Sequence, residues 1–346
     1  MTTDTLNPTP LNPRAWLYPT PRGLYCEPGD FYVDPAVAVA RAVITHGHGD
    51  HARPGHRNAL ATPETLAIMR NRFQDMPDTS QQALKYGDSV KIGDVEVSLV
   101  PAGHILGSAQ VVLEHKSQRI VVSGDYKRRP DPTCPAFEPV PCDVFITEAT
   151  FALPVFHHPP DMVEIGKLLR SLETFPERTH LVGVYALGKC QRVIKLLRAA
   201  GYDKRIWLHG ALASLCTLYQ DHGVDLGDIA LVSDAILETF KGAIVLCPPS
   251  AISDRWTRRF NEPIPAMASG WMGVRARARQ RGAELPLIIS DHADWSELCM
   301  TLKDVGAPKV WVTHGREEAL VHMARSLGIE AEALHIAGRE EDEGET

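Results

Sequence analysis

Four potential metal ligands lie within six positions near the start of the chain. The segment that carries them reads Thr45-His46-Gly47-His48-Gly49-Asp50-His51 and follows the apolar run 42–44. Imidazole nitrogen and carboxylate oxygen both suit Zn2+, which takes about four ligands. A loop can turn several side chains toward one point, and the interspersed glycines allow backbone angles that other residues resist. The spacing therefore predicts a metal site in a loop where a strand ends.

One loop cannot complete two metal sites, so we expect further ligands from later strand ends. Three candidates follow apolar runs and lie in turns of small residues: His104, Asp125 and His314. Each of them alone is also compatible with an ordinary Gly-His or Gly-Asp turn. Their order and their shared context after a strand favour metal binding by the set.

The periodicity of the apolar residues predicts the elements that must position these ligands. Short β-rich runs predict strands, and apolar residues at helical spacing predict helices. The expected strands are 95–100, 109–114, 120–123, 144–147, 179–185, 243–247, 285–290 and 309–313. The expected helices are 162–174, 189–200, 295–305 and 317–327. Helices alternate with strands after residue 162, which predicts a small α/β layer with a parallel sheet.

Taken in order, these motifs resemble the metallo-β-lactamase superfamily, whose signature is His-x-His-x-Asp-His followed by a distant His, Asp and His. Two further residues and an insertion resemble its β-CASP nuclease branch. The residues are Glu148, which follows a strand, and His292, which precedes the last ligand. The resemblance implies an α/β fold, namely a metallo-β-lactamase αββα sandwich with an inserted small α/β domain. The implied division is 1–155 and 285–338 for the sandwich, 156–284 for the insert and 339–346 for an acidic tail.

The resemblance also implies two divalent metal ions, with Zn2+ expected and Mn2+ as the alternative. One ion would be held by His46, His48, His104 and Asp125. The other would be held by Asp50, His51, His314 and a bridging Asp125.

For catalysis, the resemblance implies phosphodiester hydrolysis by a hydroxide that two metals activate. Asp50 would also orient this nucleophile, and His292 would be the general acid. Glu148 would hold His292 in its productive tautomer, while Asp34 would orient a first-loop ligand from outside the metal shell. The alternatives are a helix-capping or core role for His292 and a plain strand-end role for Asp34.

The insert is expected to act as the substrate clamp. Its Ser269-Gly270-Trp271-Met272 segment and the arginines that follow resemble the bacterial ligase-associated DNA exonucleases. Gly188 and Lys189 lie at the start of an expected helix, so the backbone N–H groups and Lys189 are candidates to hold a phosphate. Ser269 and Arg275 are further candidates for phosphate contacts. A helical lysine that reaches toward solvent is the alternative for Lys189.

Charge and cysteine content bound the setting of the protein. The 346 residues carry a net charge of -7, which at first disfavours a polyanionic partner. Five of the 43 acids lie in the tail, however, and the remaining 38 nearly balance the 36 basic residues. Positive charge is concentrated at 255–281, which holds seven arginines and one acid. Seven cysteines without a CxxC pair, and a polar start without an apolar signal segment, predict a reducing cytoplasm and no membrane span.

The resemblance therefore implies a metal-dependent DNA exonuclease that acts in repair or end processing. Its expected partners are DNA that is single-stranded or has a free end, an ATP-dependent DNA ligase and a helicase. An RNA-processing nuclease like RNase J is the first alternative. A small-molecule metallo-hydrolase and a non-catalytic scaffold are the others; the hydrolase has no need of Glu148, His292 or the insert.

Overall fold

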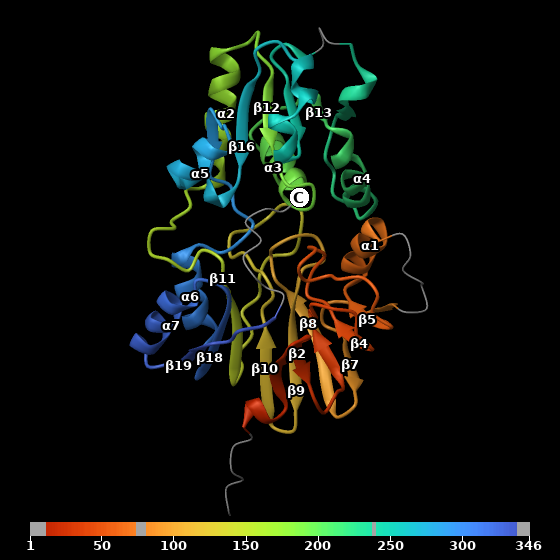
Figure 1. Cartoon of the computed structure of the whole chain (residues 1–346), viewed down its shortest axis with the longest axis vertical. Helices are drawn as coiled ribbons and strands as arrows, with labels where there is room; N and C mark the ends of the chain where they lie inside the picture. Colours follow the sequence, from red (N-terminus) through yellow and green to blue (C-terminus); the bar gives the residue numbers. More distant parts are fainter. Residues whose placement is uncertain (1–11, 74–80, 237–239, 338–346) are drawn as a thin grey trace, which may run out of the picture.

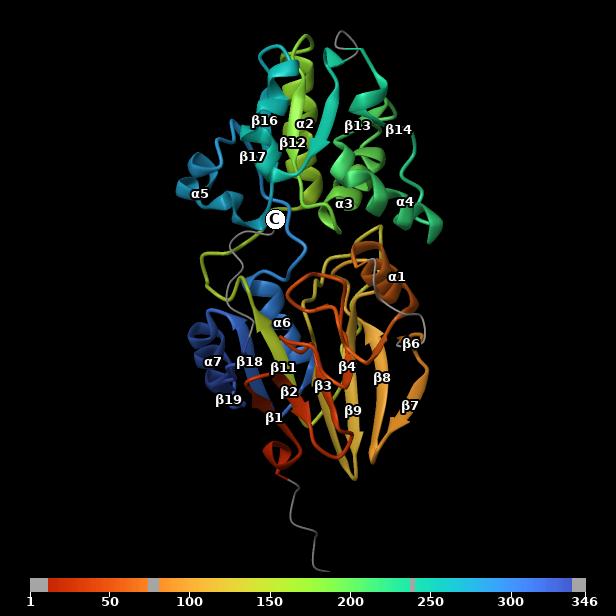
Figure 2. The same cartoon turned by 45° about the vertical axis from the view of Figure 1, so that its right-hand side comes forward.

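The computed structural model describes residues 12–73, 81–236 and 240–337, and the predicted acidic tail, 339–346, lies outside them. Within the described residues the strands form three sheets, two of six strands and one of seven. Figures 1 and 2 show two lobes stacked along the long axis. The first lobe holds two of the sheets and the insert lobe, which runs from α2 to β17, holds the third.

The first lobe is built around two sheets that face each other. The first sheet has the order β1 to β6, and its strands are Leu17–Thr20, Gly23–Cys26, Phe31–Val33, Arg41–Val43, Asn58–Ala61 and Gln81–Ala83. The second sheet has the order β19-β18-β11-β10-β9-β8-β7. In chain order from β7 to β11, its strands are Ser89–Ile92, Val95–Pro101, Ala109–His115, Gln118–Val122 and Val144–Ala149. Two later strands complete it, β18 (Lys309–Gly315) and β19 (Glu330–Ala333).

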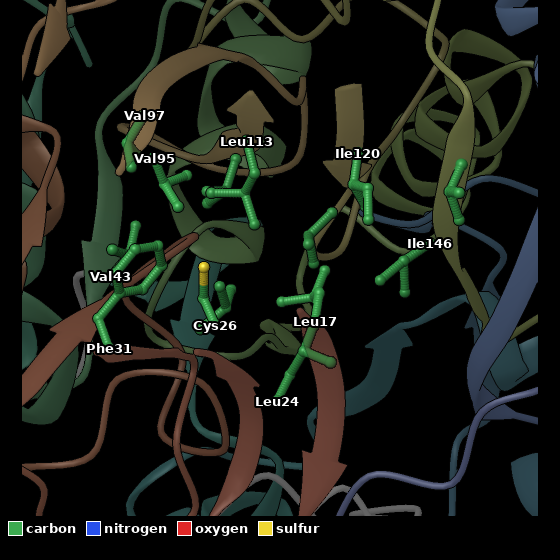
Figure 3. Packing of buried hydrophobic residues seen from close by; sticks show 14 of the residues in the cluster. Leu17, Leu24, Cys26, Phe31, Val43, Val95, Val97, Leu113, Ile120 and Ile146 are labelled. Carbon is green, nitrogen blue, oxygen red and sulfur yellow. The ribbon is translucent and has the colours of Figure 1, made fainter. Parts of the chain in front are cut away.

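A core of branched apolar side chains fills the space between the two sheets. Figure 3 shows Leu17, Leu24 and Phe31 of the first sheet facing Leu113 and Ile120 of the second. Each fully buried side chain of this size contributes about 1.5–3 kcal/mol of apolar transfer free energy. This core therefore fixes the two sheets, and with them the strand ends, against each other.

Helices cover the outer faces of both sheets. Helices α6 (Trp295–Val305) and α7 (Glu317–Ser326) pack on the second sheet. Helix α1 (Pro63–Arg72) packs on the first sheet. Strand β11 is buried on both faces, which explains why it begins with the apolar run 144–146 rather than with alternating polar residues. The order of layers is the αββα sandwich that the resemblance implied.

The insert lobe holds a fully parallel sheet with the order β14-β13-β15-β12-β16-β17. In chain order its strands β12 to β17 are His180–Gly183, Ile206–Leu208, Ile229–Leu231, Ile244–Cys247, Ile264–Ala268 and Leu285–Leu287. Its helices α2 to α5 are Asp161–Thr174, Lys189–Ala199, Ala213–Asp221 and Arg275–Gln280. Strand β17 pairs with β16, so the third sheet extends past the expected boundary at residue 284. An apolar run of this length does not reveal which sheet it joins, because either sheet would bury it.

The two lobes meet through an apolar contact beside the ligand loops. Ile68 of α1, together with Ile105 and Leu106, packs against Leu215 and Tyr219 of α4. The same proximity of α1 and α4 is visible in both whole-chain views (Figures 1 and 2). Among the described residues, none of the helices has the length and apolar character that a bilayer crossing requires.

Candidate metal centre and its cavity

The predicted ligands converge because parallel strands end at one edge of the second sheet. Strands β8, β10, β11 and β18 run in the same direction, and β4 of the first sheet ends nearby. His104 follows β8, Asp125 follows β10, and His314 lies near the end of β18 with a backbone φ of 60°. Strained backbone at a non-glycine residue is typical of functional sites. The strand ends thus supply ligands to the loop that follows β4.

The loop after β4 rests directly on helix α1. A Cβ at Gly47 would lie 2.5 Å from the Cγ2 of the buried Ile68. The Gly47 carbonyl also accepts a hydrogen bond from the Arg72 Nη1 at 2.8 Å. Glycine is therefore required at this position by close packing, and α1 holds the loop in place.

Asp34 holds the same loop in place through hydrogen bonds to two of its residues. Its carboxylate accepts hydrogen bonds from the Thr45 N–H at 2.7 Å, from the Thr45 hydroxyl at 2.6 Å and from the His51 Nδ1 at 2.8 Å. It is 1% exposed and has a φ of 44°. These contacts leave the Nε2 of His51 to face the other ligands, as expected of a residue that orients a ligand.

Two groups of donor atoms share one carboxylate. Within each group the donor atoms lie within 4.8 Å of one another. The first donor group is His46, His48, His104 and Asp125, and the second donor group is Asp50, His51, Asp125 and His314. The Asp125 Oδ2 lies 3.5 Å from the His46 Nε2 and 3.4 Å from the His51 Nε2. All seven predicted ligands are therefore brought together, with Asp125 between the two groups.

The chemistry of these groups fits divalent cations. The buried Nε2 of His51 and the buried Oδ1 of Asp125 have no hydrogen-bond partner among the described residues. Burial lowers the pKa of His46 and His104 well below the usual value, which keeps their imidazoles neutral as metal ligands must be. Burial also lowers the pKa of His51, but the carboxylates around it outweigh that effect and raise it well above 6.5. The carboxylates gathered at this point favour the binding of a positively charged ion. A set of imidazole nitrogen and carboxylate oxygen donors suits Zn2+ or Mn2+.

Glu148 and His292 form a pair at the rim of the centre. The His292 Nδ1 lies 2.9 Å from the Glu148 Oε2, and Glu148 also accepts from the Tyr126 N–H at 2.7 Å and the Thr150 hydroxyl at 2.5 Å. A register shift in β11 falls at Glu148, and such bulges re-aim side chains. Burial lowers the pKa of His292, but the Glu148 charge and hydrogen bond outweigh it and raise the pKa to about 9. This pair can hold a proton beside the ligands.

A cavity of about 100 Å3 opens between the lobes at this point. Its walls combine ligands, the rim pair and insert residues: His48, Asp50, Asp125, Thr150, Phe151, Tyr185, Lys189, Ser269, Gly270, Trp271, Ser290, Asp291, His292, His314 and Gly315. An adjoining hollow of about 70 Å3 shares Tyr185, Ser269 and Trp271 with it. The centre is therefore reached through a space with walls from both lobes.

The three predicted substrate contacts have different places in the structure. Ser269 lines the cavity, and its Oγ accepts a hydrogen bond from the Trp271 N–H at 3.3 Å. Arg275 is exposed at the start of α5. Lys189 is 3% exposed, and its ammonium lies 2.9 Å from an Asp291 carboxylate oxygen and donates to the Ile289 carbonyl at 2.8 Å. Lys189 also lines the cavity, so its phosphate contact stays a prediction, with two internal partners already engaging its ammonium.

Other cavity residues were not singled out by sequence reasoning. The Arg277 guanidinium lies 3.7 Å from the centre of the Trp271 ring, and both residues line the adjoining hollow. Tyr185 and Phe151 add further aromatic walls. The sequence feature that could have indicated these residues is the tryptophan of the Ser-Gly-Trp-Met segment, which lies shortly before the arginine run.

Comparison with known proteins adds relatives of stated activity. No protein-family model matches the sequence. The chain is 27% identical over 320 residues to a "Probable DNA ligase" of Opitutus terrae, which covers 90% of this chain and 30% of that protein. It is 24% identical over 380 residues to "Ribonuclease TTHA0252" of Thermus thermophilus, with 86% of each chain covered. It is 27% identical over 204 residues to "Endoribonuclease YSH1" of Gibberella zeae, which covers 56% of this chain and 24% of that protein.

The chain thus spans less than a third of the length of two of these relatives. A crystal structure of a protein of unknown function from Enterococcus faecalis has a similar fold, with a TM-score of 0.58 at 13% identity over 87% of this chain and 80% of that one. The layered fold, the two donor groups at one sheet edge and these relatives together are consistent with the β-CASP branch of the metallo-β-lactamase-fold nucleases, which the sequence resembles.

Proposed function

We propose that the chain is a metal-dependent DNA exonuclease that hydrolyses phosphodiester bonds during repair or end processing. The observation that carries the proposal is the pair of donor groups sharing Asp125, with His292 and Glu148 at their rim, in one cavity between the lobes. Two cations about 3.5–4 Å apart suit phosphodiester hydrolysis. The filled ligand positions argue against a non-catalytic scaffold, and the insert wall of the cavity argues against a small-molecule hydrolase.

The catalytic roles follow from the positions of the side chains. Cations in the two donor groups would supply Lewis-acid stabilisation of phosphate charge and a nucleophilic water near neutral pH. The carboxylate of Asp50 reaches the cavity and can accept a hydrogen bond from the attacking water. His292, protonated through its pair with Glu148, donates a proton to the leaving oxygen. Aromatic side chains of the insert contact the bases and exclude bulk water.

DNA is the proposed substrate because the relative that matches 90% of this chain is named as a probable DNA ligase. The protein named as a probable DNA ligase contains a segment similar to 90% of this chain within a much longer polypeptide. A nuclease that trims ends before joining is a chemically sensible companion of a ligase. The rival substrate is RNA, which the relatives named as ribonuclease and endoribonuclease support.

The remaining parts of the proposal concern the setting. Zn2+ is the proposed metal, with Mn2+ as the alternative, since imidazole and carboxylate donors accept both. An ATP-dependent DNA ligase and a helicase are the proposed partners. A cytoplasmic location is proposed because the cysteines are free, including Cys190 and Cys216, whose sulfurs lie 3.7 Å apart.

The test uses purified protein and matched 5′- and 3′-labelled strands of single-stranded DNA, duplex DNA and RNA, each with Zn2+ or Mn2+. Mononucleotides released in order from one DNA end are the expected products. Preferential cleavage of RNA would replace DNA with RNA as the substrate, and internal cuts would replace the exonuclease with an endonuclease. Absence of cleavage on every strand would overturn the nuclease proposal. A preparation of the Asp125→Asn variant controls for contaminating nucleases.

A further inference from the structure

The insert lobe touches the metal-ligand loops directly through the start of helix α3. The Leu187 carbonyl lies 3.4 Å from the His48 Nε2. Gly188 has a φ of +85°, and a Cβ there would lie 2.4 Å from the Cγ2 of Ile105, the neighbour of His104. No side chain separates the helix from this ligand loop at Gly188, so the position of α3 fixes the surroundings of His48 and His104.

A second part of the insert reaches His104 through the chain segment that returns to the first lobe. The Asp291 carbonyl accepts a hydrogen bond from the His104 Nδ1 at 2.8 Å. Three successive residues of this segment are held by buried lysines. Lys189 donates to the Ile289 carbonyl at 2.8 Å and pairs with the Asp291 carboxylate at 2.9 Å, and Lys127 donates to the Ser290 carbonyl. The carbonyl that meets His104 is therefore rigidly placed.

Arg192 of α3 ties the returning segment to other parts of the chain. Its fully buried guanidinium lies 3.1 Å from Asp131 in the first lobe, 2.5 Å from Asp161 at the start of α2 and 3.8 Å from Asp291. A buried ion network of this kind contributes little net stability, because desolvation offsets the attraction. The geometric consequence of this network is that the Arg192 side chain connects the start of the insert at Asp161, the segment that leaves the insert at Asp291 and the first-lobe loop that contains Asp131.

We propose that the insert lobe and the segment that returns from it supply the outer hydrogen bonds of the first donor group, and that Lys189, Arg192 and Asp291 are positioning residues for its metal. The Leu187 and Asp291 carbonyls occupy the Nε2 of His48 and the Nδ1 of His104. The remaining nitrogens then face each other at 3.0 Å, with the His46 Nε2 at 3.1 Å from the His48 Nδ1. Outer partners that fix the tautomer of a ligand typically change metal affinity 10- to 100-fold.

This inference rests on the metal binding within the proposed function, but not on the substrate. It implies that metal affinity depends on how the insert sits against the first lobe. A displacement of α3 would withdraw the Leu187 carbonyl and, through Lys189 and Arg192, loosen the Asp291 carbonyl. The first donor group would then lose two orienting contacts together.

The experiment measures Zn2+ affinity of the full chain by competition with a chromogenic chelator. Asp291→Asn keeps the backbone carbonyl and the side-chain shape but removes the charge that Lys189 and Arg192 hold. The matched control is Asp131→Asn, which removes a charge from the same guanidinium without touching the segment that meets His104. We expect at least one Zn2+ to bind about 10-fold more weakly in the first variant and within about twofold of wild type in the control.

Equal weakening in both variants would overturn the inference, because the network would then act only through general stability. Wild-type affinity in Asp291→Asn would overturn it as well. Should Asp291→Asn not fold, Lys189→Met provides the same test, with weaker Zn2+ binding expected and unchanged binding contradicting the inference. Because the readout is metal affinity, a wild-type protein that binds Zn2+ without cleaving nucleic acid would refute the proposed function and leave this test intact.

Discussion

Replacement of Glu148 by glutamine tests whether His292 works as a charged acid. The substitution keeps the shape of the side chain and removes the negative charge that faces the His292 Nδ1 at 2.9 Å. That charge and its hydrogen bond are what raise the pKa of His292 to about 9 against the opposing effect of burial. In the variant only burial and more distant charges remain, so we expect the pKa of His292 to fall to about 6.5 or lower.

The expected loss of activity follows from this lowering of the His292 pKa by about 2.5. Bound cations lower the pKa of His292 in both proteins, so the comparison is between the two pH profiles. At a pH one unit below the wild-type basic pKa, the protonated fraction of His292 is about 90% in the wild type and about 3% in the variant, which is a loss of about 30-fold. At a pH three units below the wild-type basic pKa, the protonated fraction of His292 in the variant is still about 75%. The sign is fixed because the charged imidazole is the active form, so activity is lost as pH rises.

The assay is the pH dependence of kcat on an end-labelled strand, with metal content measured in parallel. The expected result is a basic limb displaced by about 2.5 units toward low pH, with near-normal activity in acid and unchanged metal content. An equal loss of activity at every pH would refute the role of Glu148 in protonating His292. Loss of metal would instead reassign Glu148, which lies beside Asp125 and His292 in a third cluster of donors.

Three further predictions concern the metals, the substrate and the fold. Asp125→Asn should lower the content of both metals, measured by elemental analysis after dialysis, because both donor groups use this carboxylate; retention of two metals would contradict the shared ligand. Arg275→Ala should weaken DNA binding and reduce the slope of the logarithm of the DNA-binding constant against the logarithm of salt concentration by about one. The control Arg205→Ala, in an exposed ion pair on the insert, should leave this slope unchanged. A slope for Arg275→Ala equal to that of the wild type would show that Arg275 does not contact the substrate. Gly47→Ala should destabilise the chain by about 1–3 kcal/mol in thermal unfolding, because its Cβ would overlap the Cγ2 of Ile68; an unchanged Tm would show that the loop is not packed this tightly.

The long, periodic elements could be predicted from the sequence, because their burial pattern is local. The expected helix 295–305 coincides with α6, and the expected strand 95–100 lies within β8, where alternate residues are buried. The short strands of the first sheet carry three or four residues each, and apart from the run 42–44, which corresponds to β4, they were not predicted. Segments of that length become strands only because a neighbouring strand pairs with them, and this information lies elsewhere in the chain.

The candidate site divides in the same way. The ligands of the loop after β4 could be recognised because four donors lie within six positions of the sequence. Lys189 was assigned to a phosphate because a lysine after a glycine at a helix start commonly faces a ligand. Its actual partners, Ile289 and Asp291, lie about 100 residues away in the chain. No local pattern encodes such a pairing, so the internal partners of Lys189 could not be predicted from the sequence, and its phosphate contact stays a prediction.

Net charge gives the least guidance of all the global quantities, because the two signs are placed separately. Asp34 and Asp125 are nearly or fully buried beside the imidazoles and Asp50 lies at the cavity wall, where divalent cations would offset their charge. Of the arginine run, Arg277 in α5 and Arg281 directly after it line the hollow that adjoins the cavity. A nucleic acid strand experiences this local field within about 10 Å at moderate salt, since more distant charges are screened. An acidic chain can therefore bind a polyanion, provided that its acids hold metals and its arginines line the path to them.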